Sequence, residues 1–289
     1  MAAKVLRLSV SRLKMAQECG EKYNLRYNLK WRPRIESANL VFGSVVHSVI
    51  ESYLISLHRG VAFDCESAFR GRWKAETAKT AISYSSIWSQ DKLEETGARL
   101  CAQFPEYWES TGYSVLVLPD GSLFLEKKMS IKVQGIEVPF IPDLVVMTSE
   151  GKILVLDLKT PAQPSFDGYV ELDEQLALYQ LGVETHGGPW GIDRVDGVGL
   201  IEFIKRPVPQ TSKGRGPYIA EPTIAGRRSN EQIAHLLQSM LAEADNIQHG
   251  RLYRRTGYAF NSPCGLCDFQ NYCRTGSTAD LIIPQQKAA

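Results

Sequence analysis

Two aspartates lie in consecutive apolar segments of the sequence, VPFIPDLVVM and ILVLDLK. If the turn between the segments centres on Glu150, the residue numbers of antiparallel partners sum to 300, and Asp143 lies opposite Asp157. Directly opposite residues have Cβ atoms roughly 5 Å apart on one face of a sheet. Because side chains alternate along a strand, Lys159 shares the face of Asp157. The sequence therefore predicts two carboxylates and one ammonium group on the same face.

This arrangement predicts a metal site. Two carboxylates this close in an apolar setting repel each other unless a cation lies between them. A hard divalent ion such as Mg²⁺ binds carboxylate oxygens, water and substrate phosphate. Lys159 could then orient or help deprotonate an attacking water, or stabilise charge on phosphate. The alternative for so short a pattern is a plain ion pair between Asp157 and Lys159 at a strand end.

Two further residue pairs have helical spacing. His47 and Glu51 share one face of the predicted helix in GSVVHSVIE, and Gly43, one turn earlier, allows another backbone to approach closely. A neutral His47 imidazole could bind the metal, although a lone histidine is more often structural. Gln175 and Tyr179 are also four residues apart, on the predicted helix that follows Lys159. They could contact DNA or brace the lysine; the alternative is an ordinary helix flank.

The order of these motifs along the chain resembles the PD-(D/E)XK nuclease superfamily, in particular its RecB-like branch. The motifs are G-x-x-x-H (Gly43, His47), P-D (Pro142, Asp143), D-x-K (Asp157, Lys159) and Q-x-x-x-Y (Gln175, Tyr179). The resemblance implies a metal-dependent nuclease in which Lys159 is catalytic. It places Gln175 and Tyr179 on the DNA-facing side of the site. The implied ligands of Mg²⁺ or Mn²⁺ are His47, Asp143, Asp157 and the carbonyl of Leu158.

Three cysteines lie close together near the end of the chain, with the spacing Cys264-x₂-Cys267-x₅-Cys273. In a reducing cytoplasm, clustered thiols indicate a metal site rather than disulfides. Cys19 is the remaining cysteine in a terminal segment, and four thiolates would complete a structural Zn²⁺ site or an iron–sulfur cluster. The set resembles the iron–sulfur staple of the AddB nuclease domain and of the small CRISPR-associated exonucleases. That resemblance implies a [4Fe–4S] cluster in preference to zinc.

The composition and charge of the chain limit the classes of protein to which it can belong. The chain has 289 residues, of which 44% are hydrophobic and 22% charged, as in a soluble globular protein. It starts without the apolar core of a signal peptide, and no apolar run approaches the roughly 18 residues that span a membrane. We therefore expect a cytoplasmic protein that does not contact a membrane.

The net charge of +1 conceals basic ends. Residues 1–40 carry nine Lys/Arg against three Asp/Glu, and residues 201–289 carry eleven against seven. Joined by the cysteines, SRLK, RYNLKWRPR and RLYRR could form one surface of cations and aromatic rings, a composition that suits single-stranded DNA. The alternative is ordinary solvated charge.

The apolar periodicity predicts a layered α/β domain. Helical spacing dominates from about Leu40 to Trp108, where Cys65 and Cys101 are expected to be small buried hydrophobes. With the family resemblance, the expected fold is a restriction-endonuclease-like mixed β-sheet flanked by helices, in one domain over 1–280. A helical insertion is expected at about 55–112 and a flexible tail at 281–289. The strands are predicted near 113–118, 123–134, 137–147, 152–159 and 195–205, and later helices near 171–186 and 229–249.

These features predict a DNA exonuclease that acts on DNA ends or single strands, in recombination, repair or CRISPR-type adaptation. The sequence has no G-x-x-x-x-G-K-[ST] motif, so ATP-driven unwinding would require a helicase or recombination partner. Two alternatives are a non-catalytic DNA-binding or adaptor subunit and a redox sensor that uses the cluster as its switch.

Overall fold

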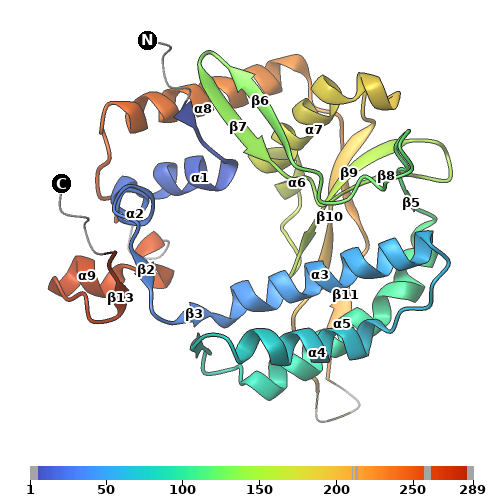
Figure 1. The fold of residues 1–289 in the computed structure, drawn as a ribbon, viewed down its shortest axis with the longest axis horizontal. Helices are drawn as coiled ribbons and strands as arrows, with labels where there is room; N and C mark the ends of the chain where they lie inside the picture. Colours follow the sequence, from blue (N-terminus) through green and yellow to red (C-terminus); the bar gives the residue numbers. More distant parts are fainter. Residues whose placement is uncertain (1–5, 210, 212–213, 257–261, 285–289) are drawn as a thin grey trace. The chain divides into compact units, whose positions relative to one another are not determined.

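The structure is a computed structural model that describes residues 6–209, 211, 214–256 and 262–284. The chain divides into two compact units (Figure 1). One unit is formed by residues 36–129 and 141–233. The other combines residues 1–35, 130–140 and 234–289.

The first of these units is built on a mixed sheet with the strand order β11-β10-β9-β8-β5, in which β12 also pairs with β10. Strands β9 and β10 are parallel, and the other pairs are antiparallel. This is the expected mixed α/β architecture. The strands are β5 (Ser114–Val115), β8 (Leu144–Met147), β9 (Ile153–Lys159), β10 (Gly197–Ile204), β11 (Tyr218–Ile219) and β12 (Thr223–Gly226).

Helices pack on this sheet because its central strands are apolar on both faces. One core joins side chains of β8, β9 and β10 to α3 (Ala38–His58), α4 (Cys65–Thr77) and α5 (Gln90–Thr111). Cys65 and Cys101 are buried in it, as expected. Helices α6 (Tyr169–Leu172) and α7 (Glu174–His186) contact β9, β10 and β12. The short strands β3 (Glu36–Ser37) and β4 (Ile82–Ser83) pair with each other beside the helices.

Helix α3 is long and apolar enough to cross a membrane, judged by length and composition. The core helix of a folded domain passes the same test. Eight residues of α3 are buried, and they pack against α4, α5 and the sheet. Its apolar character is therefore explained by the core of this unit.

The second unit holds both ends of the chain. Strand β1 (Leu6–Arg7) runs parallel to β7 (Ile136–Phe140), which pairs with β6 (Met129–Val133). Ser9 caps α1 (Val10–Glu18) by accepting a hydrogen bond from the backbone of Arg12. The unit also contains α2 (Gly20–Tyr23), the π-helical turn Asn24–Asn28, most of α8 (Asn230–Gln248), the 3₁₀ turn Pro263–Leu266 and α9 (Gln270–Thr275).

Some element boundaries differ from the expectation. The segment predicted as one strand at 137–147 forms two strands, separated at 141–143, and the helix predicted at 171–186 is divided at Asp173, which caps α7. The tail expected from 281 begins with a strand: β13 (Leu281–Ile282) pairs with β2 (Arg32–Pro33). Leu281 is buried against Leu25 and Phe269, which holds this strand in place. Residues 285–289 lie outside the described part of the chain.

Candidate active site and cysteine cluster

The strand pair β8–β9 positions the two aspartates. Leu144 pairs with Leu156 and Val145 with Val155, which is the predicted register. Asp143 precedes β8 directly, and its Oδ2 accepts a hydrogen bond of 2.6 Å from the backbone N–H of Leu158. Burial raises the pKa of Asp143 to about 6, although the Leu158 N–H and Lys159 oppose the shift. The carboxylate is thus held in place, at a cost that a bound cation would relieve.

Asp157 lies between an amide and an ammonium group. Gln175 Nε2 donates to its Oδ1 at 3.2 Å, and Lys159 Nζ lies 2.5 Å from its Oδ2. The second contact is a short ion pair, and the buried Oδ2 has no further partner among the described residues. Burial, followed by the charge of Asp143, raises the pKa of Asp157 to about 6. An ion pair therefore exists, as the alternative interpretation expected, but its carboxylate is buried and keeps a raised pKa despite the ammonium.

His47, on α3, approaches the same place. Its Nδ1 lies 3.6 Å from Asp143 Oδ2. Burial lowers the pKa of His47, more than the nearby Asp157 raises it. The imidazole is therefore neutral at pH 7, which is the form that binds metals.

Glu126 completes a group that the sequence did not suggest. One potential ligand atom each from His47, Glu126 and Asp143 lie within 4.8 Å of one another. The Glu126 backbone donates to the Asp143 carbonyl at 2.9 Å, and its φ of 45° is in the left-handed region. Burial first, and then the charges of Asp143, Glu51 and Asp157, raise the pKa of Glu126 to about 7. In sequence Glu126 is one acid beside two lysines, with no spacing that marks it.

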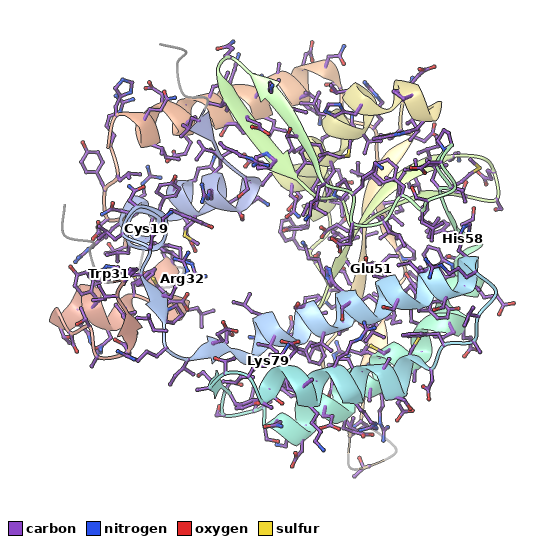
Figure 2. The ribbon with its side chains drawn as sticks, in the orientation of Figure 1. Cys19, Trp31, Arg32, Glu51, His58 and Lys79 are labelled. Atoms are coloured by element: carbon purple, nitrogen blue, oxygen red, sulfur yellow. The ribbon has the colours of Figure 1, made fainter. Side chains whose placement is uncertain are left out.

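A cavity of about 410 Å³ opens at this group, lined by α3 and Glu126. Glu51 lines it one helical turn after His47 and is labelled on α3 in Figure 2. Gly43 lies one turn before His47, and a Cβ there would be 3.3 Å from Thr160 Oγ1. The neighbour at this glycine is thus a side-chain oxygen of the residue that follows Lys159, and not another backbone as the sequence suggested. The lining residues are Gly43, Ser44, His47, Ser48, Glu51 and Glu126.

Helix α7 supplies the amide that holds Asp157. Asp173 caps the helix by accepting from the backbone N–H groups of Gln175 and Leu176. Gln175 Nε2 also lies 2.6 Å from Tyr179 Oη. Tyr179 is only 4% exposed, so its ring is part of the interior and not of the surface. Gln175 therefore braces the partner of Lys159 rather than the lysine itself.

The donor set fits a hard divalent ion. It offers carboxylate oxygens, a neutral imidazole and one buried carboxylate oxygen, Asp157 Oδ2, whose partner among the described residues is Lys159. Glu126 and Asp143 in this group, and the neighbouring Asp157, all have raised pKa values, which is the electrostatic mark of a site that gains from a cation. The group within 4.8 Å does not include Asp157, whose oxygens face Gln175 and Lys159.

The other unit brings the four clustered cysteines to one cavity of about 280 Å³. Cys19 ends α1, and its Sγ lies 3.4 Å from the backbone nitrogen of Arg255. The next residue is Gly20, where a Cβ would lie 2.6 Å from the backbone nitrogen of Tyr253. Only a glycine allows this approach, which brings the labelled Cys19 of Figure 2 to the C-terminal segment. Cys264, Cys267 and Cys273 line the same cavity.

Cations surround these thiols. Lys22, Arg254, Arg255 and Arg274 also line the cavity. Arg254 donates to the Cys273 carbonyl at 3.2 Å. Burial raises the pKa of Cys267 and Cys273, while Lys22 and Arg254 oppose the shift at these two thiols. The cavity therefore suits a negatively charged thiolate complex.

The basic end segments lie in this unit and contact one another. The Arg12 guanidinium is 4.5 Å from the centre of the Tyr27 ring, and Trp31 packs edge-on against Tyr272 at 4.9 Å. Arg255 donates to the Gln17 carbonyl. The N-terminal and C-terminal cations are thus parts of one folded unit, with aromatic rings among them.

The amino-acid sequence matches the family model described as the PD-(D/E)XK nuclease superfamily over residues 7–274. No curated protein matches the chain. A solved structure titled "Crystal structure of SSO0001" is similar, with a TM-score of 0.33 and 14% identity over 79% of this chain and 93% of that chain. A similarity this low adds nothing to the family model. Since that model spans the mixed sheet and the segments that carry His47, Asp143 and Lys159, the chain belongs to the PD-(D/E)XK nuclease superfamily.

Proposed function

We propose that this protein is a metal-dependent DNA exonuclease of the RecB-like branch, which hydrolyses phosphodiester bonds at DNA ends or in single strands. The observation that carries the proposal is the group formed by His47, Glu126 and Asp143 beside the buried Asp157 and its partner Lys159. Superfamily membership suggests nuclease activity. Recombination, repair or CRISPR-type adaptation are the processes in which such an activity would act.

The proposed ligands of Mg²⁺ or Mn²⁺ are His47, Asp143, Asp157 and the Leu158 carbonyl, together with Glu126. When bound, the ion supplies Lewis-acid activation of water and neutralises charge on the phosphate. Gln175 fixes Asp157 by donating to Oδ1, which leaves Oδ2 for the ion and Lys159. Lys159 remains protonated, since Asp157 and Asp143 raise its pKa more than burial lowers it. A protonated Lys159 orients water or stabilises charge on phosphate.

The proposal includes a structural [4Fe–4S] cluster held by Cys19, Cys264, Cys267 and Cys273. The support for this part is that the four cysteines line one cavity of about 280 Å³ together with four cations. Four thiolates could instead hold one tetrahedral zinc ion.

One experiment tests the nuclease proposal directly. The purified protein is incubated with 5′- or 3′-end-labelled single- and double-stranded DNA and with closed circular DNA, in Mg²⁺ or Mn²⁺. We expect stepwise loss of nucleotides from linear DNA, and no digestion of the circle. Digestion of the circle would make the enzyme an endonuclease. Binding of DNA without digestion under any of these conditions would indicate the non-catalytic subunit instead.

A further inference from the structure

The loop that follows β9 exposes an aromatic ring. Phe166 is 62% exposed. The Tyr169 ring lies perpendicular to it, with the ring centres 5.4 Å apart and the planes at 85°. Because most of Phe166 is exposed, its ring remains accessible to a third ring. Leu172, on α6, is also exposed at 73%, so it serves as a nearby apolar control.

The backbone before the ring is fixed by a buried acid. Glu202, on β10, is 2% exposed, and its Oε1 accepts from the backbone N–H of Ser165 at 3.0 Å and from Ser165 Oγ at 2.7 Å. After the ring, the Tyr169 N–H donates to the Phe166 carbonyl at 3.0 Å. The Tyr169 hydroxyl donates to Asp173 Oδ2 at 3.0 Å. The loop that carries Phe166 is therefore fixed by hydrogen bonds on both sides of the ring. This reduces the conformational entropy that is lost when a ligand stacks on Phe166.

The same contacts place the loop beside Lys159. Glu202 is the direct partner of Lys159 across the parallel strands β9 and β10, so the two side chains share a face about 4.8 Å apart at the backbone. The carboxylate of Asp173, which anchors Tyr169, also acts on the Lys159 ammonium. Asp157 and Glu202 in turn act on the Tyr169 phenol. The aromatic pair therefore borders the residues assigned to hydrolysis.

We propose that Phe166, braced by Tyr169, is a stacking platform for one unpaired nucleobase next to the phosphodiester that is cleaved. This inference rests on the proposed nuclease function and names the substrate class more closely. A ring stacks on any base because every base has a π face, so the platform selects no sequence. Inside a duplex the faces of a base are covered by its neighbours. The platform therefore favours single strands and frayed ends over intact duplex.

Binding is tested with the full-length protein and an oligonucleotide that carries 2-aminopurine at successive positions, with Ca²⁺ in place of Mg²⁺. Stacking quenches the fluorescence of this base. We expect binding to quench the fluorescence most strongly at one position of the oligonucleotide. Phe166→Trp and Leu172→Ala should keep this quenching. Phe166→Leu and Phe166→Ala should lose it. Equal quenching by Phe166→Leu and the unaltered protein would overturn the proposal, because leucine is apolar but has no ring.

Cleavage supplies the second test. We expect an abasic residue at that position to lower kcat/KM of the unaltered protein roughly tenfold. Phe166→Ala should have a kcat/KM lower by the same factor on the intact strand, and the abasic residue should not lower it further. If Phe166→Ala has the same kcat/KM as the unaltered protein on both the intact and the abasic strand, the proposed stacking role of Phe166 is wrong, while the nuclease function stands. If the unaltered protein digests no DNA, the nuclease function itself fails.

Discussion

Lys159 Nζ lies 2.5 Å from Asp157 Oδ2, in an ion pair whose carboxylate is buried. In a strand-end ion pair on a surface, both charged groups would be exposed to solvent. Here Asp157 is 2% exposed and Asp143 is 9% exposed, so both carboxylates are withdrawn from bulk solvent. The pair is therefore better explained as part of a cation site than as a stabilising contact, since burying charges in this way costs free energy.

Replacing Asp157 or Lys159 should abolish most of the chemistry. Asp157→Ala removes a proposed metal ligand, and Lys159→Ala removes the charge that acts on water or phosphate. Each change should lower the rate of DNA cleavage by roughly a hundredfold or more. The measurement is initial digestion rate in Mg²⁺, with circular dichroism to verify folding. Glu150→Ala, in the exposed turn between the same two strands, is the matched control and should keep full activity. Near-normal digestion by either site variant would refute the assignment.

Glu126 should set the metal requirement. Its carboxylate is one of three groups within 4.8 Å, so Glu126→Gln weakens the site while it preserves the size of the side chain. We expect the Mg²⁺ concentration for half-maximal activity to rise roughly tenfold, with activity recovered at high Mg²⁺. Glu150→Gln should leave the metal titration unchanged. A normal titration for Glu126→Gln would remove this residue from the site.

Without a divalent ion, the protein should become less stable as the pH rises. The pKa values of Asp143 and Asp157 are about 6 and that of Glu126 is about 7, all above their ordinary values near 4. A carboxyl group whose pKa is raised by folding stabilises the protein below its unfolded pKa, and this contribution is lost as the pH rises through the folded pKa. The loss falls between about pH 4 and pH 7. His47, with its lowered pKa, acts in the opposite direction below pH 6.5, but it is one group against three.

The corresponding measurement is the urea midpoint from pH 4.5 to pH 8, with and without Mg²⁺. The midpoint should fall with rising pH in the absence of Mg²⁺, and Mg²⁺ should restore it above pH 7. Glu126→Gln should have a flatter profile, because one of the three titrating carboxyls is gone. A midpoint that rises with pH without Mg²⁺ would contradict these pKa shifts.

Much of this site was predictable because it depends on periodicity. Alternation along two strands was enough to place Asp143 opposite Asp157, and Lys159 on the same face as Asp157. A four-residue spacing was enough to put Gln175 and Tyr179 on one side of a helix. Glu126 was not predictable, because its approach to Asp143 depends on a left-handed backbone at a break in a strand.

Tertiary contacts decided the remaining differences. The buried carboxylate of Glu202 holds the Phe166 loop, but in sequence Glu202 is one acid within an apolar strand. Leu281 forms a strand because Leu25 and Phe269 provide a small core for it. In each case the contacting residue lies far away along the chain, so a local sequence pattern could not predict the contact.

Cys19 should be needed for both the colour and the stability of the protein. With a [4Fe–4S] cluster on four thiolates, the purified protein should be brown, with broad absorbance around 400 nm. Cys19→Ser should bleach it, because this residue joins the N-terminal segment to the three cysteines near the C-terminus. Closing so long a loop stabilises a fold by about 4 kcal/mol in the chain-entropy model, a large share of the roughly 5–15 kcal/mol typical of a domain. The variant should therefore have a lower melting temperature and lower solubility.

The control for this experiment is Cys101→Ala, at a thiol buried among the helices of the other unit. It should keep the colour, and it loses at most a small packing contribution. Iron and sulfide analysis then separates the possible outcomes. A colourless protein with one equivalent of zinc would replace the cluster with a zinc site. A Cys19→Ser variant with full colour and an unchanged melting temperature would remove Cys19 from the site, because its thiol would then be neither a ligand nor a link between the two ends of the chain.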